Sequence, residues 1–247
     1  MKENKYDDNI FFQKYSQMSR SQQGLAGAGE WETLRKLLPD FKDKRVLDLG
    51  CGYGWHCIYA MEHGASSVVG VDISHKMLEV AKEKTHFPQV EYKCCAIEDV
   101  EFPEESFDVI LSSLAFHYVA DYEILVKKIY RILKSGGNLV FTVEHPVFTA
   151  YGTQDWYYNE KGEILHFPVD NYYYEGKRTA VFLGEKVTKF HRTLTTYLNT
   201  LLSNGFIINH IVEPQPPEYM MDIPGMQDEM RRPMMLIVSA NKNCYTT

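Results

Sequence analysis

The sequence predicts an α/β fold in which a doubly wound, mostly parallel sheet carries helices on both faces. As far as residue 144, short apolar runs alternate with segments of helical periodicity, and this alternation is typical of a parallel sheet. A glycine-rich turn joins the first strand to the helix that follows it. Towards the C-terminus, two strand-like runs follow each other without an intervening helix, which departs from simple alternation.

The elements can be placed in order along the chain. Strands are expected over 45–49, 67–72, 90–95, 108–114 and 138–144, with helices near 55–63, 74–85 and 122–133. Ser74 is a suitable N-cap, and Leu78 and Ala81 follow it on one helix face. The run Lys134-Ser135-Gly136-Gly137 is typical of a helix C-cap and a turn into the fifth strand. A last helix over 193–203, with Gly205 as its C-cap, precedes strands over 206–212 and 234–240.

Composition and charge limit the class of protein. The 247 residues are 45% hydrophobic and 24% charged, values typical of a single globular domain over residues 1–247. A net charge of −7 argues against a large nucleic-acid interface. No apolar run is long enough to cross a membrane, and the N-terminus is too polar for a signal peptide. The five cysteines show no metal-ligand spacing, so we expect a cytoplasmic protein without a structural metal.

The segment VLDLGCGYGW, residues 46–55, carries the strongest functional signal. Glycines in a strand-to-helix turn permit unusual dihedral angles and close approach of a ligand, and the turn presents free N–H groups. A nucleotide-type cofactor site is therefore expected. A dinucleotide fingerprint would need a third glycine where Trp55 stands, and no Gly-Lys-Ser/Thr of a P-loop follows. The second strand ends at Asp72, whose carboxylate can accept both hydroxyls of a ribose.

The pattern VLDLGCGYG, followed by GVDIS at 70–74, resembles the class I S-adenosylmethionine (SAM)-dependent methyltransferases. The resemblance implies a seven-stranded sheet whose last strand is antiparallel, with SAM as cofactor and S-adenosylhomocysteine (SAH) as product. It also implies that Asp48 orients the turn, that Asp72 takes the ribose hydroxyls and that Ile73 packs on the adenine. Ala96 stands where the family usually has an acid, so that contact is missing. The implied cofactor-binding residues are Asp48, Gly50, Cys51, Gly52, Gly54, Asp72, Ile73, Met77, Ala96, Ile97, Ser112 and Leu114.

Three segments lie outside the expected strands and helices of the sheet. Two of them follow strands of the sheet, and in an open α/β sheet ligands bind at the carboxyl ends of the strands. We expect residues 1–29 to form an N-terminal lid, 146–190 an insertion after the fifth strand, and 213–233 a loop on the substrate side. The tyrosines of the insertion could form a cage for a cationic acceptor or the small core of a lid. Candidates for contact with substrate or lid are Tyr15, Trp55, Trp156 and Tyr172.

Three histidines are candidates for a catalytic base. If the acceptor is a hydroxyl, a base must take its proton, and histidine titrates in the suitable range. His145 follows the fifth strand, His117 ends the fourth-strand segment, and His191 precedes the helix expected at 193–203. A structural role is the alternative for each of them.

The sequence indicates a SAM-dependent methyltransferase that moves a methyl group by direct, SN2-like transfer to a small molecule. No Asn/Asp-Pro-Pro-Tyr/Phe sequence follows the fourth strand, which favours a small acceptor over DNA. An RNA or protein methyltransferase and a non-catalytic SAM-binding sensor or partner subunit are alternatives, and a binder of another nucleotide comes last. The identity of the acceptor and the oligomeric state stay open. An RNA or protein substrate would require a basic rim, for which the candidates are Lys186, Lys189, Arg192, Arg231 and Arg232.

Overall fold

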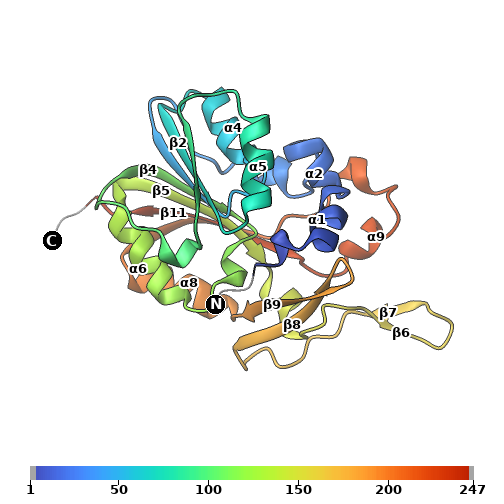
Figure 1. Cartoon of the computed structure of the whole chain (residues 1–247). Coiled ribbons are helices and arrows are strands. Elements are labelled where there is room, and N and C mark those ends of the chain that lie inside the picture. Colours follow the sequence, from blue (N-terminus) through green and yellow to red (C-terminus); the bar gives the residue numbers. More distant parts are fainter. Residues whose placement is uncertain (1–3, 245–247) are drawn as a thin grey trace.

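The computed structural model describes residues 4–244 and contains one large sheet (Figure 1). Its strands are β1 (Arg45–Leu49), β2 (Ser67–Asp72), β3 (Val90–Cys94), β4 (Phe107–Ser113), β5 (Leu133–Glu144), β10 (Phe206–Val212) and β11 (Met235–Lys242). They lie in the order β10-β11-β5-β4-β1-β2-β3. Neighbours from β3 across to β5 are parallel, whereas β11 is antiparallel to both β5 and β10. The expected seven-stranded sheet with an antiparallel last strand is confirmed.

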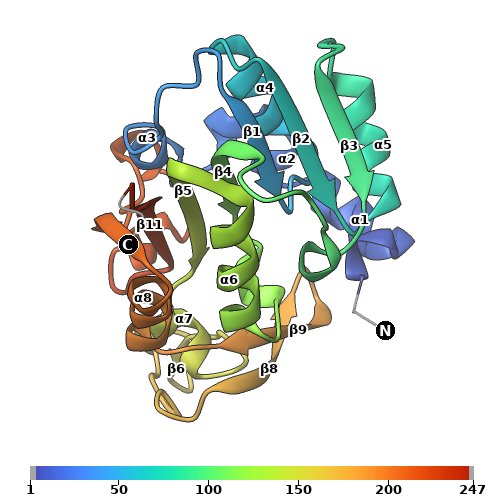
Figure 2. The same ribbon diagram turned by 90° about the vertical axis from the view of Figure 1, so that its left-hand side faces the viewer.

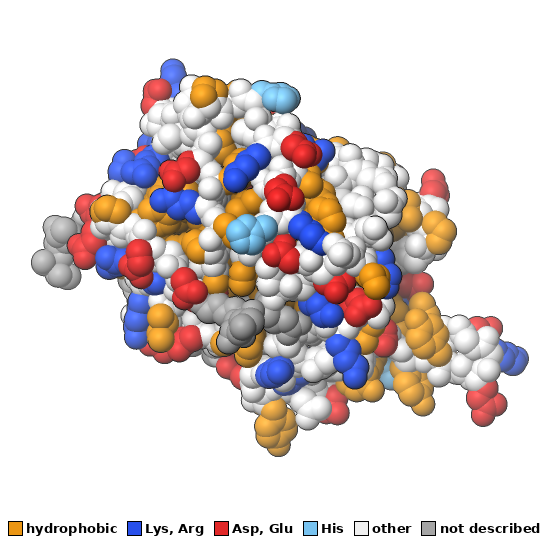
Figure 3. All heavy atoms as spheres, in the orientation of Figure 1, with side chains coloured by type: hydrophobic (Ala, Val, Ile, Leu, Met, Phe, Trp, Pro, Cys, Tyr) orange, Lys and Arg blue, Asp and Glu red, His pale blue; other side chains and the backbone are white. Residues whose placement is uncertain are grey.

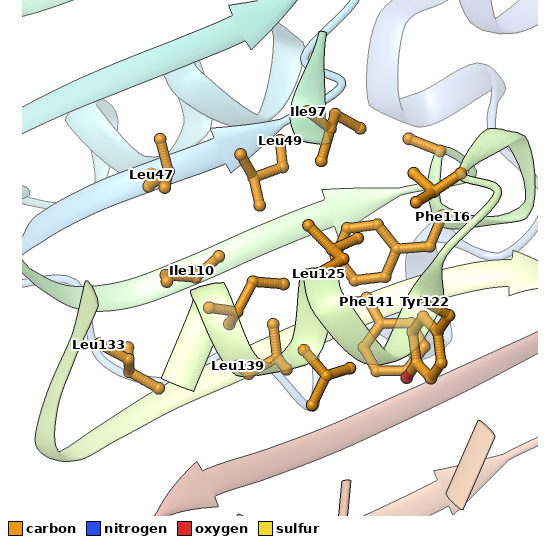
Figure 4. Close-up of a cluster of buried hydrophobic side chains, with 14 of the residues drawn as sticks. Leu47, Leu49, Ile97, Ile110, Phe116, Tyr122, Leu125, Leu133, Leu139 and Phe141 are labelled. Carbon is orange, nitrogen blue, oxygen red and sulfur yellow. The ribbon is translucent and has the colours of Figure 1, made fainter. Parts of the chain in front are cut away.

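Helices cover both faces of this sheet because alternate residues of a strand point to opposite sides. They include α3 (Trp31–Leu34), α4 (Trp55–Glu62), α5 (His75–Lys84), α6 (Tyr122–Ile132) and α8 (Leu194–Ser203). Leu47 and Leu49 belong to a cluster that also contains Leu125 of α6 (Figure 4). The same cluster includes Leu201 of α8. Val46 belongs to the opposite cluster, with residues of α3, α4 and α5. Figure 2 shows α6 and α4 on opposite sides of the sheet.

One local prediction holds and another is wrong. Oγ of Ser74 accepts from the N–H of Met77 at 3.1 Å, so Ser74 is the N-cap of α5 as expected. The run 134–137 is not a C-cap and turn, because α6 ends at Ile132 and β5 begins at once with Leu133. Leu133 pairs with β4, and a register shift in this pairing accommodates the glycines within the strand.

The insertion after β5 has secondary structure of its own. It contains α7 (Pro146–Ala150) and two antiparallel hairpins, β6 (Tyr157–Tyr158) with β7 (Ile164–His166) and β8 (Gly176–Phe182) with β9 (Glu185–His191). The β6–β7 hairpin projects from the body of the molecule, whereas β8 and β9 run beneath it in Figure 1. Between β10 and β11 the chain forms the short helices η5 (Glu218–Met220) and α9 (Met226–Glu229).

The segment before β1 is helical and is hydrogen-bonded to the N-terminus of α5. It contains η1 (Lys5–Asp7), α1 (Asn9–Ser16), α2 (Ser19–Gln23) and η2 (Gly24–Gly27) before α3. The carboxylate of Asp7 accepts from Oγ of Ser74 at 2.6 Å and from the N–H of Lys76 at 3.1 Å. Burial acts in the opposite direction, but these hydrogen bonds lower the pKa of Asp7 below its ordinary value.

Asp7→Ala is expected to loosen the N-terminal segment without unfolding the domain. The change removes an acceptor at the N-terminus of α5, where such a cap contributes about 1 kcal/mol. Amide hydrogen exchange in α1 should accelerate roughly fivefold, because local opening becomes easier by that amount. Glu160→Ala, on the exposed hairpin, is the matched control and should change nothing in α1. Unchanged exchange in Asp7→Ala would show that the segment is held by its other contacts.

The part of the chain that the structure describes shows neither a membrane-crossing helix nor a metal centre. No helix within residues 4–244 is both long and apolar enough to cross a bilayer. In the same residues, no group of three or more His, Cys, Asp or Glu side chains is arranged to hold a metal ion.

Candidate functional site

The carboxyl edge of the sheet brings the turn after β1 next to the end of β2. The N–H groups of Gly50 and Cys51 donate to the carbonyl of Val71 at 2.8 and 2.9 Å. The N–H of Gly52 donates to Oδ2 of Asp72 at 2.9 Å. Gly50 has a φ of +80°, and a Cβ there would lie 2.4 Å from Cβ of Ala115. The turn is therefore anchored on β2, and only glycine fits at position 50.

Two carboxylates lie at this turn in different surroundings. Oδ1 of Asp72 accepts from the N–H of Ser74 at 2.9 Å, and burial raises the pKa of Asp72 to about 6. Asp48 is only 1% exposed, and burial raises its pKa to about 7. Its Oδ2 lies 3.5 Å from Sγ of Cys57, and its Oδ1 has no partner among the described residues. Asp48 thus lies beneath the turn, whereas Asp72 reaches the surface above it.

A cavity of about 550 Å³ lies above this edge. The segment before β1 contributes Tyr6 and Met18 to its walls, and the β8–β9 hairpin contributes Phe182 and Phe190. Two segments that are far apart in sequence therefore enclose one space. The sequence-predicted residues that line it are Tyr15, Gly50, Gly52, Asp72, Ile73, Met77, Ala96, Ile97, Leu114 and His117.

Some of the residues predicted to bind the cofactor, the substrate or the lid lie outside this cavity. Cys51 and Trp55 line a smaller cavity beside the turn. Gly54 precedes α4 with a φ of +76°, and a Cβ there would lie 2.2 Å from Oη of Tyr92, so its role is to let the helix begin. Oγ of Ser112 donates to the carbonyl of Leu49 at 2.7 Å, and it is the next residue, Ser113, that lines the cavity.

His117 is the one predicted histidine that lines the cavity. It is 2% exposed, and burial lowers its pKa to about 4, so the ring is neutral at pH 7. Its Nδ1 accepts from the N–H of Glu144 at 3.3 Å. A neutral imidazole carries a single hydrogen, so that hydrogen is on Nε2.

The other two histidines are held by protein groups away from the cavity. Nε2 of His145 lies 2.8 Å from a carboxylate oxygen of Glu213. The ring of His191 lies between Oγ1 of Thr149, at 2.7 Å, and the carbonyl of Tyr172, at 2.9 Å. The structure does not bring the three candidates together.

Two aromatic candidates pack within the insertion. Trp156 stands edge-on to Phe167 with ring centroids 5.2 Å apart, and the guanidinium of Arg232 lies 5.0 Å above the Trp156 ring. Oη of Tyr172 accepts from the N–H of Leu194 at 3.1 Å. The contact between Trp156 and Phe167 lies within the insertion and agrees with a small core there, one of the two roles that the sequence allows. Arg232 and Leu194 belong to neighbouring segments.

A buried ion pair, of which Glu144 lines the cavity, was not predicted from the sequence. Glu144, at the end of β5, pairs with Lys189 of β9, and Gln154 donates to its other oxygen at 2.6 Å. Burial would raise the pKa of Glu144, but nearby charges and hydrogen bonds hold it below its ordinary value. The alternation of Val187, Lys189 and His191, all buried on one side of β9, is the signal that could have identified the lysine.

Fold and site together define a class of protein. The turn after the first strand, the acid that ends the second strand and the cavity above both are typical of a domain that binds a nucleoside-type cofactor. Comparison with known families narrows this class. A family model described as a methyltransferase domain matches residues 47–141.

Solved structures and one relative agree with this match. A protein from Listeria monocytogenes assigned to the SAM-dependent methyltransferases is 58% identical, with a TM-score of 0.85 over 89% of this chain and 99% of its own. A SAM-dependent methyltransferase from Mesorhizobium loti is 40% identical, with a TM-score of 0.82 over 89% of this chain and 100% of its own. Ubiquinone biosynthesis O-methyltransferase from Coxiella burnetii is 35% identical over 112 residues, 44% of this chain and 47% of that protein. The chain belongs to the class I SAM-dependent methyltransferases, and it is an enzyme whose cofactor is SAM.

Proposed function

We propose that the enzyme methylates a small molecule that binds in the large cavity. The observation that carries this proposal is the enclosure of the cavity between the N-terminal segment and the β8–β9 hairpin. Its volume of about 550 Å³ lies within the range of small-ligand sites, roughly 300–1,000 Å³. The similar Coxiella enzyme acts, by its name, in the biosynthesis of a small molecule.

The cofactor would occupy the part of the cavity beside the turn. In this proposal Asp72 accepts the ribose hydroxyls, and Ile73 and Ile97 pack against the adenine. The residues present fit such a ligand, because no atom lies within 4 Å of where a Cβ of Gly52 would be. The missing side chain at Gly52 leaves the space that a closely bound ligand needs.

The remaining walls would hold the methyl acceptor. Bound SAM supplies an electrophilic methyl group on a sulfonium, and the protein must align the acceptor and exclude water. Such positioning can lower a barrier by roughly 7–11 kcal/mol. Because its hydrogen is on Nε2, His117 would donate a hydrogen bond to the acceptor rather than take its proton. This favours an amine, which loses its proton to water after the methyl transfer, or a phenol-type hydroxyl, which can lose its proton to water beforehand. An aliphatic alcohol is disfavoured because its proton needs a base.

The charge distribution argues against an RNA or protein acceptor. On the face seen in Figure 3, acidic and basic side chains are interspersed, and no continuous basic surface is visible. Most of the candidate rim residues are engaged within the protein: Lys189 with Glu144, Arg192 with the carbonyls of Val119 and Ala120, Arg231 with Asp228, and Arg232 with Glu229.

An acceptor screen tests the proposal. Purified enzyme would be incubated with SAM and sets of phenols, amines and carboxylic acids, with total RNA and unfolded protein as comparison acceptors, and SAH release would be measured. We expect release above the acceptor-free rate only with a small-molecule set, and loss of that release in Asp72→Ala. Turnover with RNA or protein alone would contradict the proposal.

Binding of SAH is expected to weaken below pH 6. Burial raises the pKa of Asp72 to about 6 in the free protein, and ribose hydroxyls bind the ionised carboxylate more strongly than the protonated one. As the pH falls through 6, protonation competes with binding, and Kd should rise by up to about tenfold per pH unit. Calorimetric titrations from pH 8 to pH 5 measure this slope. Asp72→Asn should bind more weakly but lack the slope, and a flat wild-type profile would contradict the prediction.

A further inference from the structure

The ion pair of Glu144 and Lys189 presents its negative member to the large cavity. Glu144 ends β5 and lines the cavity, whereas Lys189 is not among the described residues of the cavity wall. The two side chains are only 14% and 3% exposed. Desolvating a buried ion pair is costly, and well-packed apolar residues of similar volume are often equally stable. Stability alone therefore gives no reason for a carboxylate at this place in the wall.

A closed ring of hydrogen bonds fixes this carboxylate. Nζ of Lys189 donates to Oε1 of Glu144 and, at 2.9 Å, to Oε1 of Gln154. Nε2 of Gln154 donates in turn to Oε2 of Glu144 at 2.6 Å. These partners hold the pKa of Glu144 below its ordinary value, so the carboxylate is ionised at pH 7. Each carboxylate oxygen has two acceptor sites, so one site on each oxygen remains for a ligand.

A neutral donor lies beside the carboxylate in the same wall. Nδ1 of His117 accepts from the backbone N–H of Glu144, which makes the two residues neighbours, and both line the cavity. The β8–β9 hairpin adds the apolar side chains of Phe182, Val187 and Phe190 to the wall. In such apolar surroundings a charge acts more strongly on a bound ligand than it would in water.

We infer that Glu144 binds the reacting nitrogen of an amine acceptor, so that the enzyme is an N-methyltransferase. The inference rests on the proposed function, in which a small molecule occupies this cavity. The nitrogen lone pair forms the new bond to the methyl carbon, and the electrons of the broken C–S bond pass to sulfur, which gives SAH. The nitrogen becomes positively charged until it loses a proton to water.

The sign of the charge on Glu144 separates an amine from a phenol. An ionised carboxylate accepts the N–H and stabilises the positive charge that develops on nitrogen in the transition state. A phenol reacts as the phenolate, whose negative charge the same carboxylate repels. The ammonium of Lys189 opposes both effects from further away, because it is Glu144 that lines the cavity.

His117 restricts what stands next to the nitrogen. The one lone pair of an amine must face the methyl group, so the Nε2–H group of His117 cannot bind the same nitrogen. It would bind a neighbouring hydroxyl or carbonyl oxygen of the acceptor. The substrate class is therefore a small amine that carries an oxygen close to its nitrogen.

Matched pairs of acceptors test the inference. The members of a pair share one carbon skeleton and differ in the reacting group: 2-aminobenzyl alcohol with 2-hydroxybenzyl alcohol, and 2-aminoethanol with ethane-1,2-diol. SAH release would be measured with SAM at pH 8, and mass spectrometry would locate the methyl group. We expect turnover of amine members only, with the methyl group on nitrogen.

A double variant tests the role of Glu144 itself. Glu144→Gln combined with Lys189→Met removes both charges, so neither is left buried and unpaired. It should lower kcat/KM for the amines roughly 10- to 100-fold, the loss expected for a hydrogen bond to a charged group. SAH affinity should change by less than about twofold. Glu229→Gln is the matched control, because Glu229 pairs with the buried Arg232 outside the described cavity wall, and it should change neither quantity.

The outcomes separate this inference from the proposal on which it rests. Turnover of the hydroxyl members alone, or equal turnover of amines by the double variant and the wild type, would overturn the inference while the small-molecule acceptor stands. A parallel loss of turnover and SAH affinity would mean that Glu144 only maintains the fold, and no turnover of any amine would also overturn the inference. Turnover with RNA or unfolded protein alone would overturn the proposed function as well.

Discussion

Asp72→Ala is expected to weaken SAH binding by at least about 100-fold. In the proposed complex two ribose hydroxyls donate to this carboxylate, and a hydrogen bond to a charged group contributes about 1.5–3 kcal/mol. Losing both corresponds to about 3–6 kcal/mol, where each 1.4 kcal/mol is a factor of ten. The same carboxylate accepts the N–H groups of Gly52 and Ser74, so its removal also releases the turn from β2.

Calorimetric titration with SAH at pH 8 would measure this loss, with circular dichroism to confirm that the variant is folded. Asp155→Ala, an exposed aspartate of the insertion, is the control and should bind SAH like the wild type. Asp72→Asn keeps one acceptor oxygen and should fall between the two. If Asp72→Ala bound SAH within about threefold of the wild type, the ribose would have to lie elsewhere in the cavity.

Substitution of Gly50 and Gly52 by alanine should separate folding from binding. At Gly50 the φ of +80° and a contact of 2.4 Å to Cβ of Ala115 act together. Backbone strain costs about 1–3 kcal/mol and overpacking a further 1–3 kcal/mol, so Gly50→Ala should lose about 2–6 kcal/mol of stability. At Gly52 the φ is +52°, but nothing lies within 4 Å of the added methyl group. Gly52→Ala should therefore lose only about 1–2 kcal/mol.

For SAH affinity, measured on the folded fraction of each variant, the order should be reversed, and Gly52→Ala should lose more than Gly50→Ala. Gly52 lines both cavities, so its added methyl group would occupy space that we assign to SAM. Urea unfolding curves give the stability of each variant, and SAH titration of the folded fraction gives its affinity. Folded Gly52→Ala should bind SAH at least about tenfold more weakly than the wild type. Normal affinity in that variant would place the ligand away from the turn.

Local signals in the sequence sufficed for most of the fold and for the position of the glycine turn beside Asp72. The turn at Gly50 and the acid at Asp72 follow adjacent parallel strands, so topology alone brings them together. Ser74 was recognisable as an N-cap because its partner, Met77, is three residues away. The prediction over 134–137 was wrong because a glycine pair is typical both of a helix C-cap and of an irregular strand. Pairing of Leu133 with β4 decided between the two.

The rest of the cavity depends on contacts between residues that are distant in the sequence. Glu144 and Lys189 are 45 positions apart and meet only because the β8–β9 hairpin folds back over the sheet edge. Likewise, nothing in the sequence separates His117 from His145 and His191, since only the folded chain places the first in the cavity wall.

The position of β11 has a consequence for the synthesis of the enzyme. This strand is made after both β5 and β10, yet it lies between them and pairs with both. Until it arrives, one edge of β5 lacks its partner, and the cavity lacks the wall formed by Met234 and Met235. The parallel strands β1, β2 and β3 are all made earlier. A nascent chain can therefore complete the sheet beside the glycine turn first, and the cavity closes only when β11 has been made.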